Sequence, residues 1–107
     1  MTPDSNILNY QNVVLQNITK DVHKAIFGGQ KKVRIGGQTY NVQTISRTSQ
    51  RYVSIGQYRF VENDPASPLA RQGHQILWVF KGDKSYARLV NRKFEIMDSS
   101  GSWRSLL

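Results

Sequence analysis

The chain has 107 residues, a formal net charge of +8 and no cysteine. This length fits one domain with one hydrophobic core, and the lack of cysteine excludes a disulfide scaffold and a thiolate metal site. The first residues lack the basic and apolar segments of a signal peptide, and the longest apolar run, 76–80, is too short to span a membrane. We therefore expect a soluble, intracellular protein, cytoplasmic rather than exported, with no membrane partner.

Residues 3–27 have the pattern of one amphipathic helix. Thr2 is a suitable N-cap and Pro3 suits the first helical position. Gly28 and Gly29 predict the end of the helix, because glycine adopts the left-handed conformation at low cost. The apolar residues that recur at helical spacing are Ile7, Leu8, Val14, Leu15, Ile18, Val22, Ala25 and Ile26.

After these two glycines the apolar pattern becomes alternating, which is typical of strands. A pair of glycines, Gly36 and Gly37, predicts a two-residue hairpin turn, with a return strand over 38–45. Such a turn places Tyr40 opposite Val33.

A second hairpin is predicted around Gly56. In this register Val53 faces Phe60 and Arg51 faces Glu62, so both an apolar pair and a charge pair match. The alternative is one long strand kinked at the glycine.

The third hairpin is predicted to join strands over 75–81 and 84–90, with a last strand over 93–97. The preceding segment, 63–73, reads as a long polar loop. One face of these strands is expected to carry Ile76, Trp78, Phe80, Ala87, Leu89, Phe94 and Ile96.

These elements predict an α+β fold, in which the helix packs on an antiparallel meander of six or seven strands, either open or closed in part into a barrel. The domain spans 1–97, and 98–107 read as a flexible C-terminal tail, although Trp103 suggests docking on the body or on a partner. The expected core is Ile18, Val22, Val33, Ile35, Tyr40, Val53, Phe60, Ile76, Trp78, Phe80, Leu89, Phe94 and Ile96.

The meander also predicts where the positive charge gathers, because turns alternate between the two ends of an up-and-down sheet. One end receives the C-terminal part of the helix, with Lys20 and Lys24. A basic surface of this kind suits an acidic partner, nucleic acid first and an acidic protein surface second. The opposing view is that loop positions carry Lys and Arg for solubility alone. The candidate nucleic-acid-binding residues are Lys31, Lys32, Arg47, Arg51, Arg71, Arg92 and Lys93.

No catalytic or metal-binding pattern stands out. His23 and His74 are the only histidines, and the acidic residues are scattered, so we predict no metal, no cofactor and no enzymatic activity. The preferred function is a non-enzymatic binding module. The alternative is a protein-interaction or assembly subunit, an adaptor or an inhibitor, that uses the helix and the C-terminal tail, with homo-oligomer formation through the helix.

Overall fold

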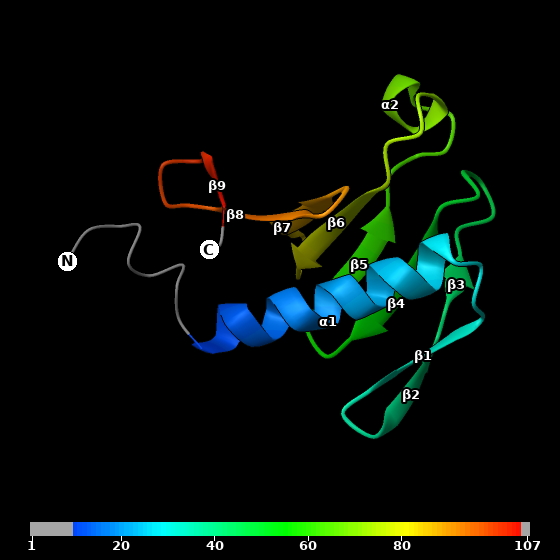
Figure 1. The fold of residues 1–107 in the computed structure, drawn as a ribbon, viewed down its shortest axis with the longest axis horizontal. Coiled ribbons are helices and arrows are strands. Elements are labelled where there is room, and N and C mark those ends of the chain that lie inside the picture. Colours follow the sequence, from blue (N-terminus) through cyan, green and yellow to red (C-terminus); the bar gives the residue numbers. More distant parts are fainter. Residues whose placement is uncertain (1–9, 106–107) are drawn as a thin grey trace.

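The computed structural model describes residues 10–105. A long helix lies across one face of an open, curved antiparallel sheet, so the predicted α+β class is confirmed and the sheet does not close into a barrel (Figure 1). The expected helix start at Thr2 and Pro3 lies outside the described residues. The elements are α1 (Tyr10–Phe27), β1 (Lys32–Ile35), β2 (Gln38–Asn41), β3 (Gln43–Thr44), β4 (Arg51–Ile55), β5 (Tyr58–Glu62), α2 (Pro68–Arg71), β6 (Ile76–Lys81), β7 (Lys84–Val90), β8 (Lys93–Met97) and β9 (Trp103–Ser105).

The predicted glycine stop ends α1. Gly29 has a φ of 73°, the left-handed conformation. Its N–H donates to the carbonyl of Ile26, and the N–H of Gln30 donates to that of Ala25. These two bonds form a Schellman motif, which satisfies carbonyls that the helix itself leaves free.

The first two predicted hairpins have the expected registers. Tyr40 pairs with Val33, and Val53 pairs with Phe60. The expected return strand over 38–45, however, is divided at Val42, and its second part leaves the two-stranded β1–β2 sheet. That second part, β3, begins the seven-stranded sheet β3-β4-β5-β6-β7-β8-β9.

The third hairpin contains a β-bulge that the sequence analysis did not predict. Phe80 pairs with Ser85, but Val79 pairs with Ala87, so Tyr86 is the extra residue on β7. The extra residue shifts the pairing by one, so Ala87 and Leu89 lie opposite Val79 and Leu77 and not opposite Trp78 and Ile76. The hydroxyl of Tyr86 donates to Asn12 Oδ1 at 2.7 Å, which ties the bulge to α1.

The expected core face of β6 was therefore wrong. Leu77 and Val79 are fully buried in the core beneath α1, whereas Trp78 and Phe80 point to the opposite face and are only half-buried. Ile76 is buried but lies outside the main core cluster. The cluster consists of Leu15, Val22, Ala25, Ile26, Val33, Val53, Phe60, Leu77, Val79, Ala87, Leu89, Phe94 and Ile96, with Ile18, Ile35 and Tyr40 half-buried against it.

The segment 98–105 also differs from the expected flexible tail. Asp98 and Ser102 close a turn, after which β9 pairs with β8, with Trp103 opposite Met97. Trp103 packs against Trp78 at 6.1 Å between ring centroids, so Trp103 docks on the sheet. The predicted loop over 63–73 contains one helical turn, α2, capped by Ser67.

Candidate functional site

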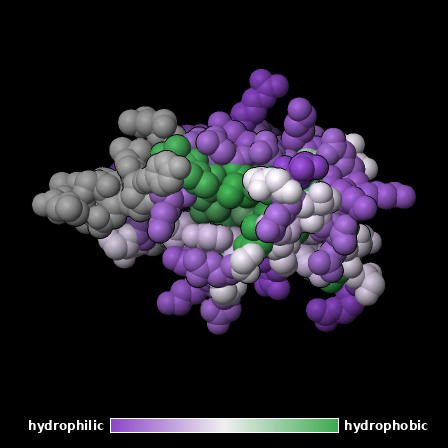
Figure 2. Space-filling model, turned by 90° about the horizontal axis from the view of Figure 1, so that it is seen from below, coloured by the Kyte–Doolittle hydropathy of each residue, from purple (hydrophilic) through white to green (hydrophobic). Residues whose placement is uncertain are grey.

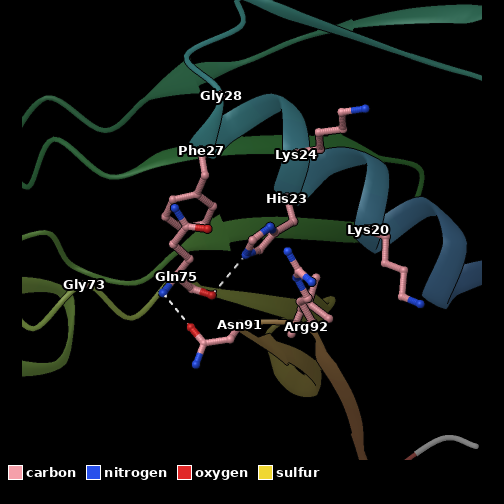
Figure 3. A pocket seen from close by; sticks show the side chains of 10 residues that line it. Lys20, His23, Lys24, Phe27, Gly28, Gly73, Gln75, Asn91 and Arg92 are labelled. Atoms are coloured by element: carbon pink, nitrogen blue, oxygen red, sulfur yellow. Dashed lines mark hydrogen bonds between the residues drawn. The ribbon is translucent and has the colours of Figure 1, made fainter.

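The C-terminal part of α1 forms one wall of a cleft of about 650 Å³. The other walls are the segment that precedes β6 and the turn between β7 and β8 (Figure 3). Lys20 and Lys24 belong to its lining and extend outward from α1, Lys24 away from His23, and Arg92 comes from the turn and approaches the ring of His23. We call this hollow the basic cleft.

Hydrogen bonds hold the walls of the basic cleft together. Nε2 of His23 lies 3.0 Å from the carbonyl oxygen of Gln75, and because a carbonyl only accepts, Nε2 must carry the proton. Gln75 N–H donates to Asn91 Oδ1 at 3.2 Å, and Asn91 N–H donates to the Gln75 carbonyl at 3.0 Å. The helix, the 73–75 segment and the β7–β8 turn are thus fixed relative to one another (Figure 3).

The floor of the basic cleft is apolar. Phe27 and Leu89 line it, and the Phe27 ring lies 4.6 Å from that of His23. No carboxylate lines the cleft, and Lys20, Lys24 and Arg92 form no ion pair with any residue in 10–105. Three uncompensated cations above an apolar floor favour an anionic ligand that also has an apolar part.

Two of the predicted binding residues lie together in the β7–β8 turn. Arg92 lines the basic cleft, and its neighbour Lys93 has a side chain that is 66% exposed. The Lys93 ammonium lies 4.0 Å from Glu95, a contact that costs little to break in water. Arg71 ends the exposed turn α2 and does not line the cleft.

The guanidinium of Arg51 already forms an ion pair with the carboxylate of Glu62. Arg51 Nε lies 2.6 Å from Glu62 Oε2, and Glu62 is buried. The hydrogen bond to this carboxylate raises the pKa of the Arg51 guanidinium, against a smaller opposing effect of burial. Its charge is therefore compensated within the fold, so Arg51 is a weak candidate for phosphate binding.

The other predicted residues, Lys31, Lys32 and Arg47, are exposed and lie beyond the basic cleft. Lys31 and Lys32 lie at the open end of the β1–β2 hairpin, where the carbonyl of Lys31 accepts from Val42 N–H at 2.9 Å. Arg47 lies in the β3–β4 turn. This turn, α2 and the C-terminal end of α1 share one side of the molecule (Figure 1).

Sequence reasoning missed the polar wall of the basic cleft. No binding role was expected of His23, Gln75 or Asn91 from the sequence. The one available signal was the spacing of Lys20, His23 and Lys24, which places all three on one side of a helix. Their contact with residues some 50–70 positions later depends on the tertiary fold.

Residues 10–105 contain no group of three or more His, Asp or Glu arranged to hold a metal ion. Among the same residues, no helix has the length and apolar character needed to cross a bilayer. Comparisons with family models, curated proteins and solved structures return no match for the chain.

Proposed function

We propose that the protein is a non-enzymatic binding module for nucleic acid and that the basic cleft contacts the phosphates. The observation that carries this proposal is the meeting of Lys20, Lys24 and Arg92 from two distant segments around a hollow with no carboxylate. Lysine and arginine that neutralise phosphates release condensed counterions, which supplies a large part of the affinity of such proteins. A nucleic-acid partner agrees with the expected intracellular location.

The proposed contact surface extends beyond the cleft. Lys93 and Arg71 flank it, and Lys31, Lys32 and Arg47 provide a further exposed cationic area on the same side. Arg51 is left out because Glu62 holds it. A long anionic polymer can reach several of these side chains at once, whereas a small anion would use only the cleft.

Fluorescence anisotropy with labelled DNA and RNA oligonucleotides, repeated at several salt concentrations, tests this proposal. We expect binding at low salt and a linear fall of log K with log salt, at about 0.7–0.9 per phosphate contact. An absence of binding to DNA and RNA at low salt would refute it.

The alternative, an assembly subunit that self-associates through α1, has one specific observation in its favour. A groove of about 320 Å³ lies between α1 and the β4–β5 hairpin, lined by Val14, Ile18, Ile55 and Tyr58 among others. Apolar side chains are visible in the middle of this face (Figure 2), and Val13 and Val14 are 43% and 36% exposed. Sedimentation at several protein concentrations tests it: a monomer throughout would rule out self-association.

A further inference from the structure

The face of the sheet that is turned away from α1 carries aromatic rings. A sheet covered by a helix on one face usually has a polar opposite face. Here Trp78 and Phe80 from β6 and Trp103 from β9 lie on that opposite face, all of them half-buried. The bulge in β7 matches this arrangement, because it pairs the core residues Ala87 and Leu89 with Val79 and Leu77 and leaves Trp78 and Phe80 on the other face.

The two tryptophans are held in fixed orientations. The guanidinium carbon of Arg88 lies 4.2 Å from the Trp103 ring centroid and 5.9 Å from that of Trp78. Arg88 Nε lies 2.8 Å from Glu95 Oε1, and Trp78 Nε1 donates to Asn63 Oδ1 at 3.2 Å. Rings fixed in this way offer a stacking surface with little conformational entropy to lose.

Trp78 and Arg88 line a second hollow, of about 760 Å³, which we call the aromatic groove. Leu69, which is 48% exposed, forms part of its edge. Asn91 and Arg92 line both the aromatic groove and the basic cleft, so the two hollows meet at the β7–β8 turn.

The charge of the aromatic groove suits the same ligand as that of the basic cleft. Its lining contains three cations, Arg88, Arg92 and Lys93, against one carboxylate, Glu95. That carboxylate accepts from Arg88 and lies within 4.0 Å of Lys93, so the groove keeps a positive excess. Aromatic rings beside cations are the combination with which proteins bind unpaired bases and their backbone.

We propose that the aromatic groove stacks one or more unpaired bases, so that the preferred ligand is single-stranded nucleic acid. This inference rests on the proposed function. The strand would cross the β7–β8 turn, with its phosphates at Arg92 and the basic cleft and its bases against Trp78. Duplex bases are stacked on one another and cannot reach such a surface.

The test compares three probes with the intact chain: a labelled oligothymidylate of about 12 nucleotides, which lies in the usual range of single-strand site sizes, an abasic strand of the same length, and a duplex. We expect oligothymidylate to bind about 5- to 150-fold more tightly than the abasic strand, the range that stacking of one base supplies. We also expect it to quench tryptophan fluorescence, which reports on the groove because Trp78 lines it and the only other tryptophan, Trp103, packs against Trp78.

A variant pair supplies a second readout. Leu69→Ala trims an exposed edge of the groove, and Leu69 lies in a helix that contains no buried residue, so the fold should be kept. Trp78→Leu removes the stacking ring, and it should reduce affinity for oligothymidylate but not for the abasic strand. Equal binding of oligothymidylate and abasic strand, without fluorescence quenching, would overturn the inference and leave the proposed function standing. Binding of none of the three probes would overturn both.

Discussion

Arg51 holds the carboxylate of Glu62 at two points: Nε lies 2.6 Å from Oε2, and Nη2 lies 3.0 Å from Oε1. The backbone N–H of Arg51 also donates to Oε2, at 2.7 Å. The pair joins β4 to β5 and accounts for a buried acid in a strongly basic chain. Arg51 therefore has a structural role, and its charge is not among those available to a ligand.

The first prediction concerns this pair. Arg51→Gln should lower the free energy of unfolding by about 1–3 kcal/mol, because it leaves a buried carboxylate without its charged partner. Urea unfolding followed by circular dichroism would measure this. The double variant Arg51→Gln with Glu62→Gln should recover part of the loss, since no uncompensated charge remains. A double variant as unstable as the sum of the two single variants would show that the residues act independently.

The second prediction concerns the bulge. Leu77→Ala should destabilise the protein by about 2–5 kcal/mol, because Leu77 is fully buried and the change leaves a cavity. Phe80→Ala should cost much less, because Phe80 lies on the opposite face beneath Arg59. Thermal unfolding of both variants gives the comparison. A larger loss of stability for Phe80→Ala than for Leu77→Ala would favour the register without the bulge and contradict the structure.

The third prediction concerns acid. Asp98 accepts from Ser100 Oγ at 2.6 Å and from Arg104 Nε at 2.8 Å, and these bonds, with the backbone N–H of Ser102, hold the pKa of Asp98 well below its usual range. Because the pKa is lower in the folded than in the unfolded state, Asp98 stabilises the β8–β9 turn fully above about pH 5, and this contribution is lost as the pH falls through the pKa of the folded state.

The measurement is tryptophan fluorescence in acid, because Trp103 begins β9. The fluorescence of the protein should change at low pH, as Asp98 becomes protonated. The Asp98→Asn variant should lack this acid transition, or should have the altered fluorescence already near neutral pH, since asparagine neither titrates nor pairs with Arg104. Identical acid profiles for the protein and Asp98→Asn would assign the change to other groups.

Much of the fold could be predicted because local signals agreed with one another. The Gly28-Gly29 stop, the glycine turns and the pairing of Val53 with Phe60 each needed only nearby residues. The face of β6 could not be predicted, because five consecutive apolar residues, 76–80, show no alternation and a single bulge in β7 decides which of them pair with the core residues Ala87 and Leu89.

The candidate site was predictable only in outline. The meander topology indicated that Arg92 and the end of α1 share one side of the protein, and they meet at the basic cleft. The pairing of Arg51 with Glu62 was itself predicted as a cross-strand contact, yet Arg51 was also counted among the ligand residues. One side chain cannot fill both roles, and only the distances of the structure favour the first.

The most direct test of the basic cleft compares two triple variants that each remove two lysines and one arginine. Lys20, Lys24 and Arg92 are changed to Gln in one; Lys81, Lys84 and Arg34, which lie away from the cleft, are changed to Gln in the other. Both lose the same net charge, so general attraction falls equally. Affinity for oligothymidylate is then measured against salt concentration. We predict that only the first variant loses affinity strongly and that its log–log salt slope falls by about 0.7–0.9 for each lost phosphate contact. Equal losses in the two variants would mean diffuse attraction without a site and would contradict the account.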